Sequence, residues 1–171
     1  MTRALSVLVV PLALALAGCG LKPLYAGGGA SPIAATLGSV DVAPIQGKSG
    51  WLMANALRDR LGAMGQGSSA AKYRLAVRLD DDIVGLGTRS DDSVARERRT
   101  LRARYQLIDA AQGTVLVDAT AGSDAGIDVV GSEYATIAAE NTALERLSET
   151  VADQIVARLA LYARRTQPQR P

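Results

Sequence analysis

The chain has 171 residues, with 19 Lys and Arg against 17 Asp and Glu, and 48% of its residues are hydrophobic. This length predicts one domain, large enough to build a core without disulfides or metals. The absence of histidine excludes Ser-His-Asp triads, Cys-His pairs and histidine metal sites. Cys19 is the only cysteine, which excludes internal disulfides and cysteine metal clusters. All basic residues except Lys22, Lys48 and Lys72 are arginines, a bias that suits phosphate or carboxylate recognition and that a GC-rich genome would also produce.

The N-terminal residues have the anatomy of an export signal. Arg3 forms a short basic segment, and residues 4–16 form an apolar run that is too short to span a bilayer. Residues 16–19, Leu-Ala-Gly-Cys, resemble the lipobox of bacterial lipoproteins. That resemblance implies a signal peptide over residues 1–18 and a mature chain that begins at Cys19, acylated on its sulfur and its amine. Two or more acyl chains hold a protein durably on a membrane.

An alternative is an ordinary secreted protein, because Ala15-Leu16-Ala17 is itself a small-residue cleavage site. Gly20 follows the cysteine, and by resemblance to enteric lipoproteins a residue other than Asp there favours the outer membrane. We expect residues 19–35 to be the lipidated N-terminus and a flexible tether, since residues 26–31 are Ala-Gly-Gly-Gly-Ala-Ser. A single domain is expected over residues 36–165, with a frayed tail at 166–171.

The first half of the domain predicts a strand followed by a helix. Val40, Val42 and Ile45 indicate a strand over about residues 36–45, placed at a sheet edge because of Pro44. Ser49 and Gly50 precede apolar residues at helical spacing, and Gly65 stands where a C-cap glycine is expected. The members of this stripe are Met53, Leu57, Leu61 and Met64.

Strict alternation then predicts three strands. Residues 72–79 form the first, and the polar segments 80–82 and 85–92 are expected to connect it to the second, at about residues 96–107. Asp109 to Gly113 reads as a hairpin turn, residues 114–120 as the third strand and residues 121–131 as a loop. On one face of the second strand the alternation places Arg99, Leu101, Ala103, Tyr105 and Leu107.

A long helix is expected from Ser132, a plausible N-cap, to about Arg165. Its predicted apolar stripe consists of Ile137, Leu144, Leu147, Val151, Ile155, Leu159 and Tyr162. The order β-α-β-β-β-α predicts an α+β fold. A four-stranded, mostly antiparallel mixed sheet would carry two helices on one face, with the first two strands parallel.

The other sheet face would carry the basic side chains. Like charges opposed across strands destabilise a sheet unless something offsets them. Such a face is therefore either interleaved with carboxylates or suited to an anion, and a solvated face is the plain alternative. Nucleic acid is not expected as a partner of an exported lipoprotein, which leaves anionic lipid headgroups, including phosphorylated glycolipids. The candidate ligand-binding residues are Arg96, Arg98, Arg102 and Arg104 on one strand, and Lys72, Arg74 and Arg78 on its neighbour.

No motif predicts an enzyme, a cofactor or a metal site. Ser69-Ala70-Ala71-Lys72 matches Ser-x-x-Lys, but the remaining elements of penicillin-recognising enzymes are absent or misplaced. Residues 80–82 and 91–92 are acidic and could attract a divalent cation, yet they lack EF-hand spacing and such loops are usually just solvated. Phosphate-binding glycine fingerprints are also absent.

Residues 19–25, Cys-Gly-Leu-Lys-Pro-Leu-Tyr, resemble the start of mature lipoproteins of the LptE family, which typically open Cys-Gly-Phe-basic-Pro-Leu-Tyr. Leu21 departs from the usual aromatic residue. The order of the predicted elements and the Arg-rich strand agree with the family at the level of pattern.

This resemblance implies a non-enzymatic lipoprotein of the outer membrane's inner leaflet that plugs the LptD β-barrel and binds lipopolysaccharide through basic residues. Together the two proteins would deliver lipopolysaccharide to the cell surface. No single arginine is carried over from the family, so the candidate residues rest on the alternation alone. A generic scaffold lipoprotein and a lipid-anchored envelope hydrolase are the alternatives from other classes.

Overall fold

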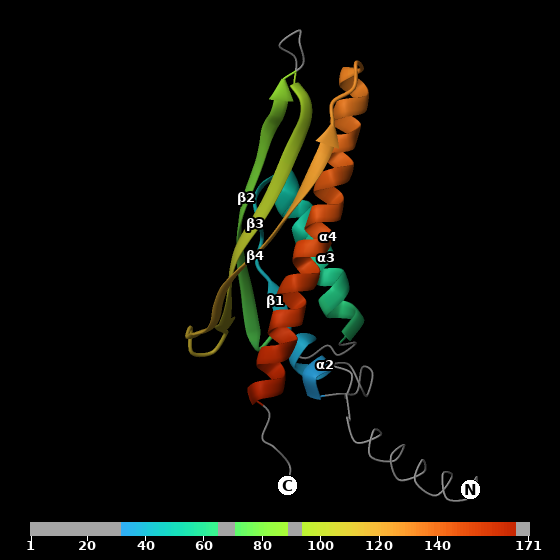
Figure 1. Cartoon of the computed structure of the whole chain (residues 1–171). Coiled ribbons are helices and arrows are strands. Elements are labelled where there is room, and N and C mark those ends of the chain that lie inside the picture. The colour runs from blue at the N-terminus through green and yellow to red at the C-terminus, as the bar shows by residue number, and fades with distance from the viewer. Residues whose placement is uncertain (1–31, 65–70, 89–93, 167–171) are drawn as a thin grey trace, which may run out of the picture.

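The computed structural model describes residues 32–64, 71–88 and 94–166 (Figure 1). The signal peptide, Cys19, most of the expected tether and residues 167–171 lie outside these ranges. The elements in chain order are α2 (Pro32–Leu37), β1 (Val40–Val42), α3 (Gly47–Met64), β2 (Tyr73–Thr88), β3 (Val94–Asp109), β4 (Val115–Asp128) and α4 (Glu133–Thr166). The predicted α+β class and the order β-α-β-β-β-α are confirmed, with the short helix α2 as an addition.

The four strands form one mixed sheet in the order β1-β2-β3-β4. β1 pairs parallel with β2, because the helical crossover α3 returns the chain to the end of the sheet where β1 began. β2 pairs antiparallel with β3, and β3 pairs antiparallel with β4. At the turn between β3 and β4, the Asp109 carboxylate accepts the amides of Ala111 and Gln112, each at 2.9 Å, and Gly113 adopts a φ of 68°. The predicted hairpin turn is confirmed.

Both long helices cover the same face of the sheet, as Figure 1 shows. They run parallel to each other. Lys48 donates to Asn141 at 2.6 Å, and Arg60 forms an ion pair with Asp153, so each link joins residues that are 93 apart. The hydrogen bond from Arg60 lowers the pKa of the Asp153 carboxyl below its usual value. These contacts fix the register of α3 against α4 along the outer layer.

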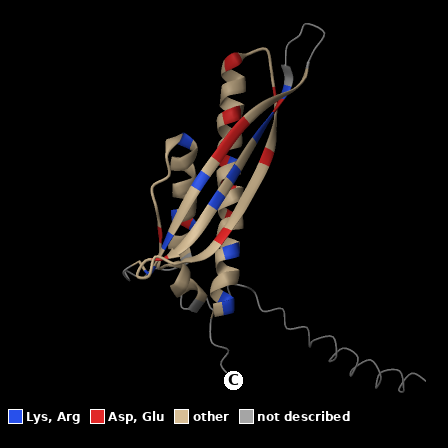
Figure 2. Cartoon of the chain, turned by 90° about the vertical axis from the view of Figure 1, so that its left-hand side faces the viewer, with Lys and Arg blue, Asp and Glu red and all other residues tan. Residues whose placement is uncertain are grey.

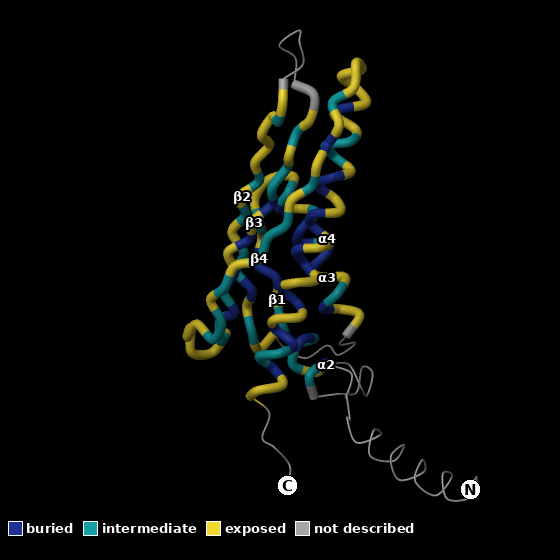
Figure 3. Tube along the Cα trace, viewed as in Figure 1, coloured by how far each residue is buried: buried dark blue, intermediate teal, exposed yellow. Residues whose placement is uncertain are grey.

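The core lies between the sheet and the helices (Figure 3). Leu101, Ala103, Tyr105 and Leu107 of β3 are buried, as the alternation predicts, and their neighbours in sequence are exposed or half-buried. Burial raises the pKa of the Tyr105 hydroxyl. The helices supply the opposite wall with Met53, Leu57 and Leu61 of α3 and with Leu144, Leu147, Val151, Ile155 and Leu159 of α4.

The strand predicted over residues 36–45 is much shorter in the structure. Residues 32–37 form α2, and only three residues pair with β2. Proline is favoured in the first turn of a helix, and Ala34 and Leu37, three residues apart, are buried on one side of α2. Residues 32–35, which we expected to end the tether, are therefore helical, and the segment from Ala43 to Gln46 is irregular.

β2 and β4 continue through segments that composition marks as loops. Asp80 to Thr88 belong to β2, and Ala121 to Asp128 belong to β4. Tertiary pairing overrides the weak strand propensity of Asp and Gly here. On the helix-facing side of β4, Ala121 and Ala125 pack against the core and Ile127 is buried. These apolar contacts stabilise the continued strand.

α4 begins after Ser132, whose carbonyl accepts the amides of Ala135 and Thr136, both at 3.1 Å. The predicted span is confirmed to within a residue, and Thr166, expected in the tail, ends the helix. The predicted stripe is wrong at Ile137, which is 45% exposed. Lys48, in the first turn of α3, contacts Asn141 of α4. Ile137 is one turn earlier in α4, so it lies beyond the N-terminal end of α3 and has no part of that helix to pack against.

A candidate anion-binding face

The sheet face turned away from the helices is the candidate site, and we call it the basic face. It consists of Lys72, the even-numbered residues of β2 and β3, and the even-numbered residues of β4 from Asp118 to Asp128. Figure 2 shows basic positions in the middle of this face, with acidic positions on β2 and β4 to either side. All seven residues proposed from the sequence are exposed, namely Lys72, Arg74, Arg78, Arg96, Arg98, Arg102 and Arg104.

The register separates these seven residues along the sheet. Lys72 and Arg74 lie at the end near β1, where Lys72 and Tyr73 donate their amides to the Ser39 carbonyl. Arg96 and Arg98 lie at the opposite end, beside Leu86 and Val84 of β2. Between these two ends lies a middle group, which consists of Arg78, Arg102 and Arg104. The structure thus brings together three of the seven, and four remain at the ends.

Two of the arginines of the basic face are neutralised by β4. Arg96 pairs with Asp128 at 3.0 Å. Arg104 donates to both carboxylate oxygens of Asp118 at 3.3 and 3.1 Å, and Gln106 donates to the same carboxylate at 2.9 Å. The hydrogen bond from Arg104, and then that from Gln106, lower the pKa of Asp118. Part of the face is therefore interleaved with carboxylates, one of the two arrangements that the sequence left open.

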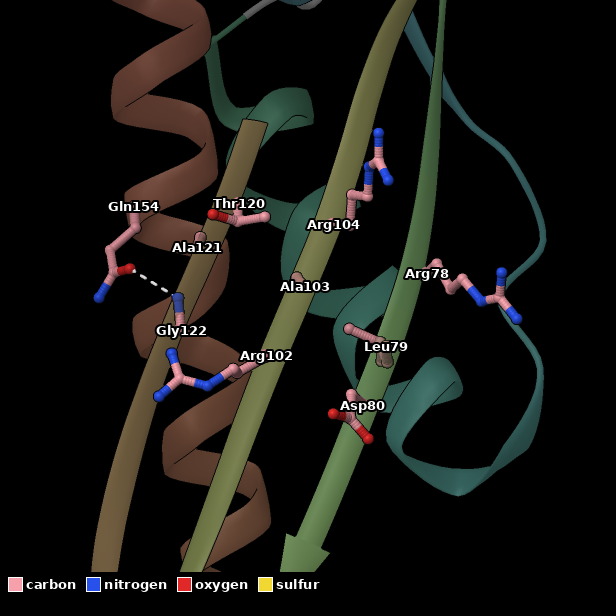
Figure 4. A pocket seen from close by; sticks show the side chains of 10 residues that line it. All are labelled: Arg78, Leu79, Asp80, Arg102, Ala103, Arg104, Thr120, Ala121, Gly122 and Gln154. Atoms are coloured by element: carbon pink, nitrogen blue, oxygen red, sulfur yellow. Dashed lines mark hydrogen bonds between the residues drawn. The ribbon is translucent and has the colours of Figure 1, made fainter. Parts of the chain in front are cut away.

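Arg78 and Arg102 differ from these two arginines. Neither has an ion pair with a residue in the described ranges, although Asp80 stands directly opposite Arg102. Arg78 is directly opposite Arg104, a like-charge pair that costs stability unless the head groups separate. In Figure 4 the three guanidinium groups of the middle group point away from one another. Their separation leaves room between them on the face.

That room is a groove of about 640 Å³. Three arginines line it, together with the Asp80 carboxylate, the Thr120 hydroxyl and the Gln154 amide, which reaches over from α4 (Figure 4). The groove therefore offers guanidinium groups that can donate paired hydrogen bonds to an anion, and polar groups that can form hydrogen bonds with hydroxyls or amides. Such a mixture suits a phosphorylated sugar better than a bare hydrophobic ligand.

Sequence reasoning missed the contributions of β4 and α4 to this groove. Thr120 could have been found, because alternation puts it on the same face as Asp118. Gly122 was assigned to a loop, and no local pattern signals that Gln154 would reach the edge of β4. Arg99, by contrast, was placed correctly on the helix-facing side, where it pairs with Asp81.

The structure divides the acidic run at residues 80–82. Alternation along β2 puts Asp80 and Asp82 on the basic face and Asp81 on the helix-facing side. In the described part of the chain, no three Cys, Asp or Glu side chains gather as a metal site would require. Ser69 of the Ser-x-x-Lys match and the acidic pair at 91–92 lie outside that part.

None of the helices in the described residues combines the length and the apolar character that crossing a bilayer requires.

Several solved structures share this fold. A lipoprotein from Caulobacter crescentus is 26% identical, with a TM-score of 0.67, and the match covers 81% of this chain and 99% of that one. A minor lipoprotein from Acinetobacter baumannii is 17% identical, with a TM-score of 0.57 and coverage of 75% and 96%. Lipoprotein B from Nitrosomonas europaea is 12% identical, with a TM-score of 0.55 and coverage of 74% and 88%. The last two establish similarity of fold alone.

Comparison with family models identifies the chain more directly. Among curated proteins, no sequence matches it significantly. The model described as "LptE: Lipopolysaccharide-assembly" matches residues 37–159, which is more than half of the chain and runs from the end of α2 almost to the end of α4. Members of this family are lipoproteins without enzymatic activity, which sets aside the envelope hydrolase. The chain therefore belongs to the LptE family of lipopolysaccharide-assembly lipoproteins.

Proposed function

We propose that this lipoprotein is anchored through acylated Cys19 at the periplasmic face of the outer membrane, where it plugs and helps assemble an LptD-type β-barrel. In that complex it takes part in delivering lipopolysaccharide to the cell surface and binds the anionic glycolipid through its basic face. The match to the LptE model over residues 37–159 carries the proposal. No cofactor is needed for this role.

The sequence supports the anchor. Cys19 closes an apolar run and follows Leu-Ala-Gly, and the chain has no other cysteine that would give the thiol a different use. Acylation at this position would tether α2 and the whole domain to the membrane surface through the short segment that precedes Pro32.

Exposed apolar side chains support a protein partner. One group lies in the late part of β2 and around the start of α4. Large apolar side chains that are left exposed are available for burial against a partner. Trp51 on α3 is 64% exposed, and tryptophan is enriched in the energetic centres of interfaces. The group consists of Ile83, Val84, Val130, Tyr134 and Ile137.

The partner can be tested by purification. When the lipidated protein carries a C-terminal tag and outer membranes are solubilised gently, we expect a large β-barrel of the LptD type to co-purify at close to one copy per copy, identified by mass spectrometry. A Cys19→Ala variant should lose the membrane fraction. If the lipidated protein is recovered from the outer membrane without a barrel, the translocon role is wrong and a generic scaffold lipoprotein becomes the better description.

The basic face can be tested by charge reversal. The double variant Arg78→Glu/Arg102→Glu should lose at least about tenfold in affinity for immobilised lipopolysaccharide, because each arginine can contribute a charge-assisted hydrogen bond to phosphate. The matched control is Arg58→Glu/Arg146→Glu, which makes the same charge change on exposed positions of α3 and α4. Equal losses in both variants would mean that net charge, and not the basic face, governs binding.

A further inference from the structure

Gly122 of β4 stands directly opposite Arg102 of β3 on the basic face. A Cβ atom at residue 122 would lie 3.2 Å from Cγ and 3.2 Å from Nη1 of Arg102, and also 3.2 Å from the Leu101 carbonyl oxygen. These distances are shorter than ordinary carbon contacts. Arg102 therefore crosses β4 through the space that a side chain at position 122 would occupy, as Figure 4 shows.

The backbone at Gly122 is also held from the other side. Its amide, on the outer edge of the sheet, donates to Oε1 of Gln154 in α4 at 3.2 Å. This bond satisfies a donor that β4, as an edge strand, would otherwise leave unpaired. A shift of the strand that relieved the contact between an added Cβ and Arg102 would lengthen this hydrogen bond to α4. Movement of the Arg102 side chain, which supplies two of the three close atoms, relieves the contact without that cost.

Of the three arginines that line the groove, Arg102 is the one that lies against Gly122 of β4 and forms no ion pair with a described residue of that strand. Arg104 is held by Asp118, and Arg78 extends from the opposite strand. Arg102 has no ion pair within the described ranges, and its guanidinium lies close to Gly122 at the β4 side of the groove. The position of this guanidinium determines whether it can donate hydrogen bonds to a phosphate bound in the groove.

We propose that Gly122 is a positioning residue for Arg102, and that the guanidinium it admits across β4 binds a phosphate of the anionic ligand in the groove. This inference rests on the proposed function of the basic face and adds a determinant within it. A guanidinium can donate two parallel hydrogen bonds to the oxygens of a phosphate, the anionic group of the proposed ligand, and Asp80 in the same groove suits a ligand that also carries hydroxyls or amines.

A double-mutant cycle tests the proposal on the full-length lipidated protein in detergent, with immobilised bisphosphorylated lipopolysaccharide as the probe. Gly122→Ala and Arg102→Ala should each lower affinity about tenfold. Gly122→Ala should cost nothing further in the Arg102→Ala background. Dephosphorylated lipopolysaccharide should bind all four proteins equally weakly. The matched control is Gly126→Ala on the same strand, where the added Cβ meets only Arg96 Nε, at 3.9 Å, and affinity should not change.

The outcomes separate this inference from the proposed function. If Arg102→Ala lowers affinity and Gly122→Ala does not, the positioning role is overturned and the basic face stands. If neither changes affinity, ligand binding at this part of the face is wrong. If Gly122→Ala costs the same with and without Arg102, glycine acts on the fold, and the inference fails. The Nε–Hε resonance of Arg102 in ligand-free protein should shift in Gly122→Ala, and an unchanged resonance would also overturn it.

Discussion

Replacing Arg99 with alanine should destabilise the domain by about 3 kcal/mol, because it leaves a mostly buried carboxylate without its partner. Arg99 donates to both oxygens of Asp81, at 2.8 and 2.7 Å, and its third bond reaches the Glu140 carbonyl of α4 at 3.0 Å. The two side chains are only 12% and 18% exposed. This cluster joins β2, β3 and α4 near the end of the sheet that lies beyond α3.

Two comparisons make that expectation specific. Arg104→Ala, which breaks an exposed pair on the opposite face, should cost less than about 1 kcal/mol. The double variant Arg99→Met/Asp81→Leu should recover most of the loss, since replacing a buried pair with apolar side chains removes both desolvation costs. Urea unfolding monitored by circular dichroism measures all three. Similar losses for Arg99→Ala and Arg104→Ala would show that the Arg99 pair is as weak as a surface pair.

The Arg99 cluster also shows what sequence patterns can reach. Alternation along β3 placed Arg99 on the same face as Leu101 and Tyr105, against the habit of reading every arginine as exposed. The pattern could not provide its partner. Asp81 lies in a run of three aspartates that composition marks as a solvated connection, and only the pairing of β2 with β3 shows that this residue turns toward α4.

The C-terminal part of β4 was missed for the same reason, because its partners are distant in the sequence. Residues 121–128 contain Gly, Asp and Ser in place of strand-forming residues, and the sequence predicted a loop there. β4 nevertheless continues because the long-range partners of these residues favour pairing. Gly122 accommodates Arg102, Asp128 pairs with Arg96, and Ile127 enters the core. Local propensity carries none of this information, since each contact involves a residue at least twenty positions away or on another layer.

The candidate site was predictable as a face and not as a groove. Period-two alternation is a property of one strand, so it gave the exposed side of β3 correctly. Whether an arginine on that side is neutralised depends on the register with β4, which brings Asp118 within reach of Arg104 and places Gly122 opposite Arg102. Two arginines that are equivalent in sequence therefore differ in the charge that they can offer a ligand.

The second large effect concerns Gly50, where alanine should destabilise the domain by about 1–3 kcal/mol because the site is already filled. Gly50 lies in the first part of α3, and a Cβ there would be 2.6 Å from the Ile45 carbonyl oxygen and 2.7 Å from its carbonyl carbon. These are backbone atoms of the segment that joins β1 to α3. Relief of the contact requires that segment to move away from the helix, and Ile45 with it, although Ile45 packs against the core.

Gly62 provides the matched control within the same helix. It is exposed, and a Cβ there would have no neighbour within 4 Å. Gly62→Ala should therefore stabilise the domain by about 0.5–1 kcal/mol, the usual gain of alanine over glycine in a helix. Because both substitutions change helix propensity in the same direction, the difference between them isolates the steric cost at Gly50. If thermal unfolding shows the same stabilisation for both, residues 43–46 do not pack against α3 as the structure has them, and the path from β1 to the helical layer must differ.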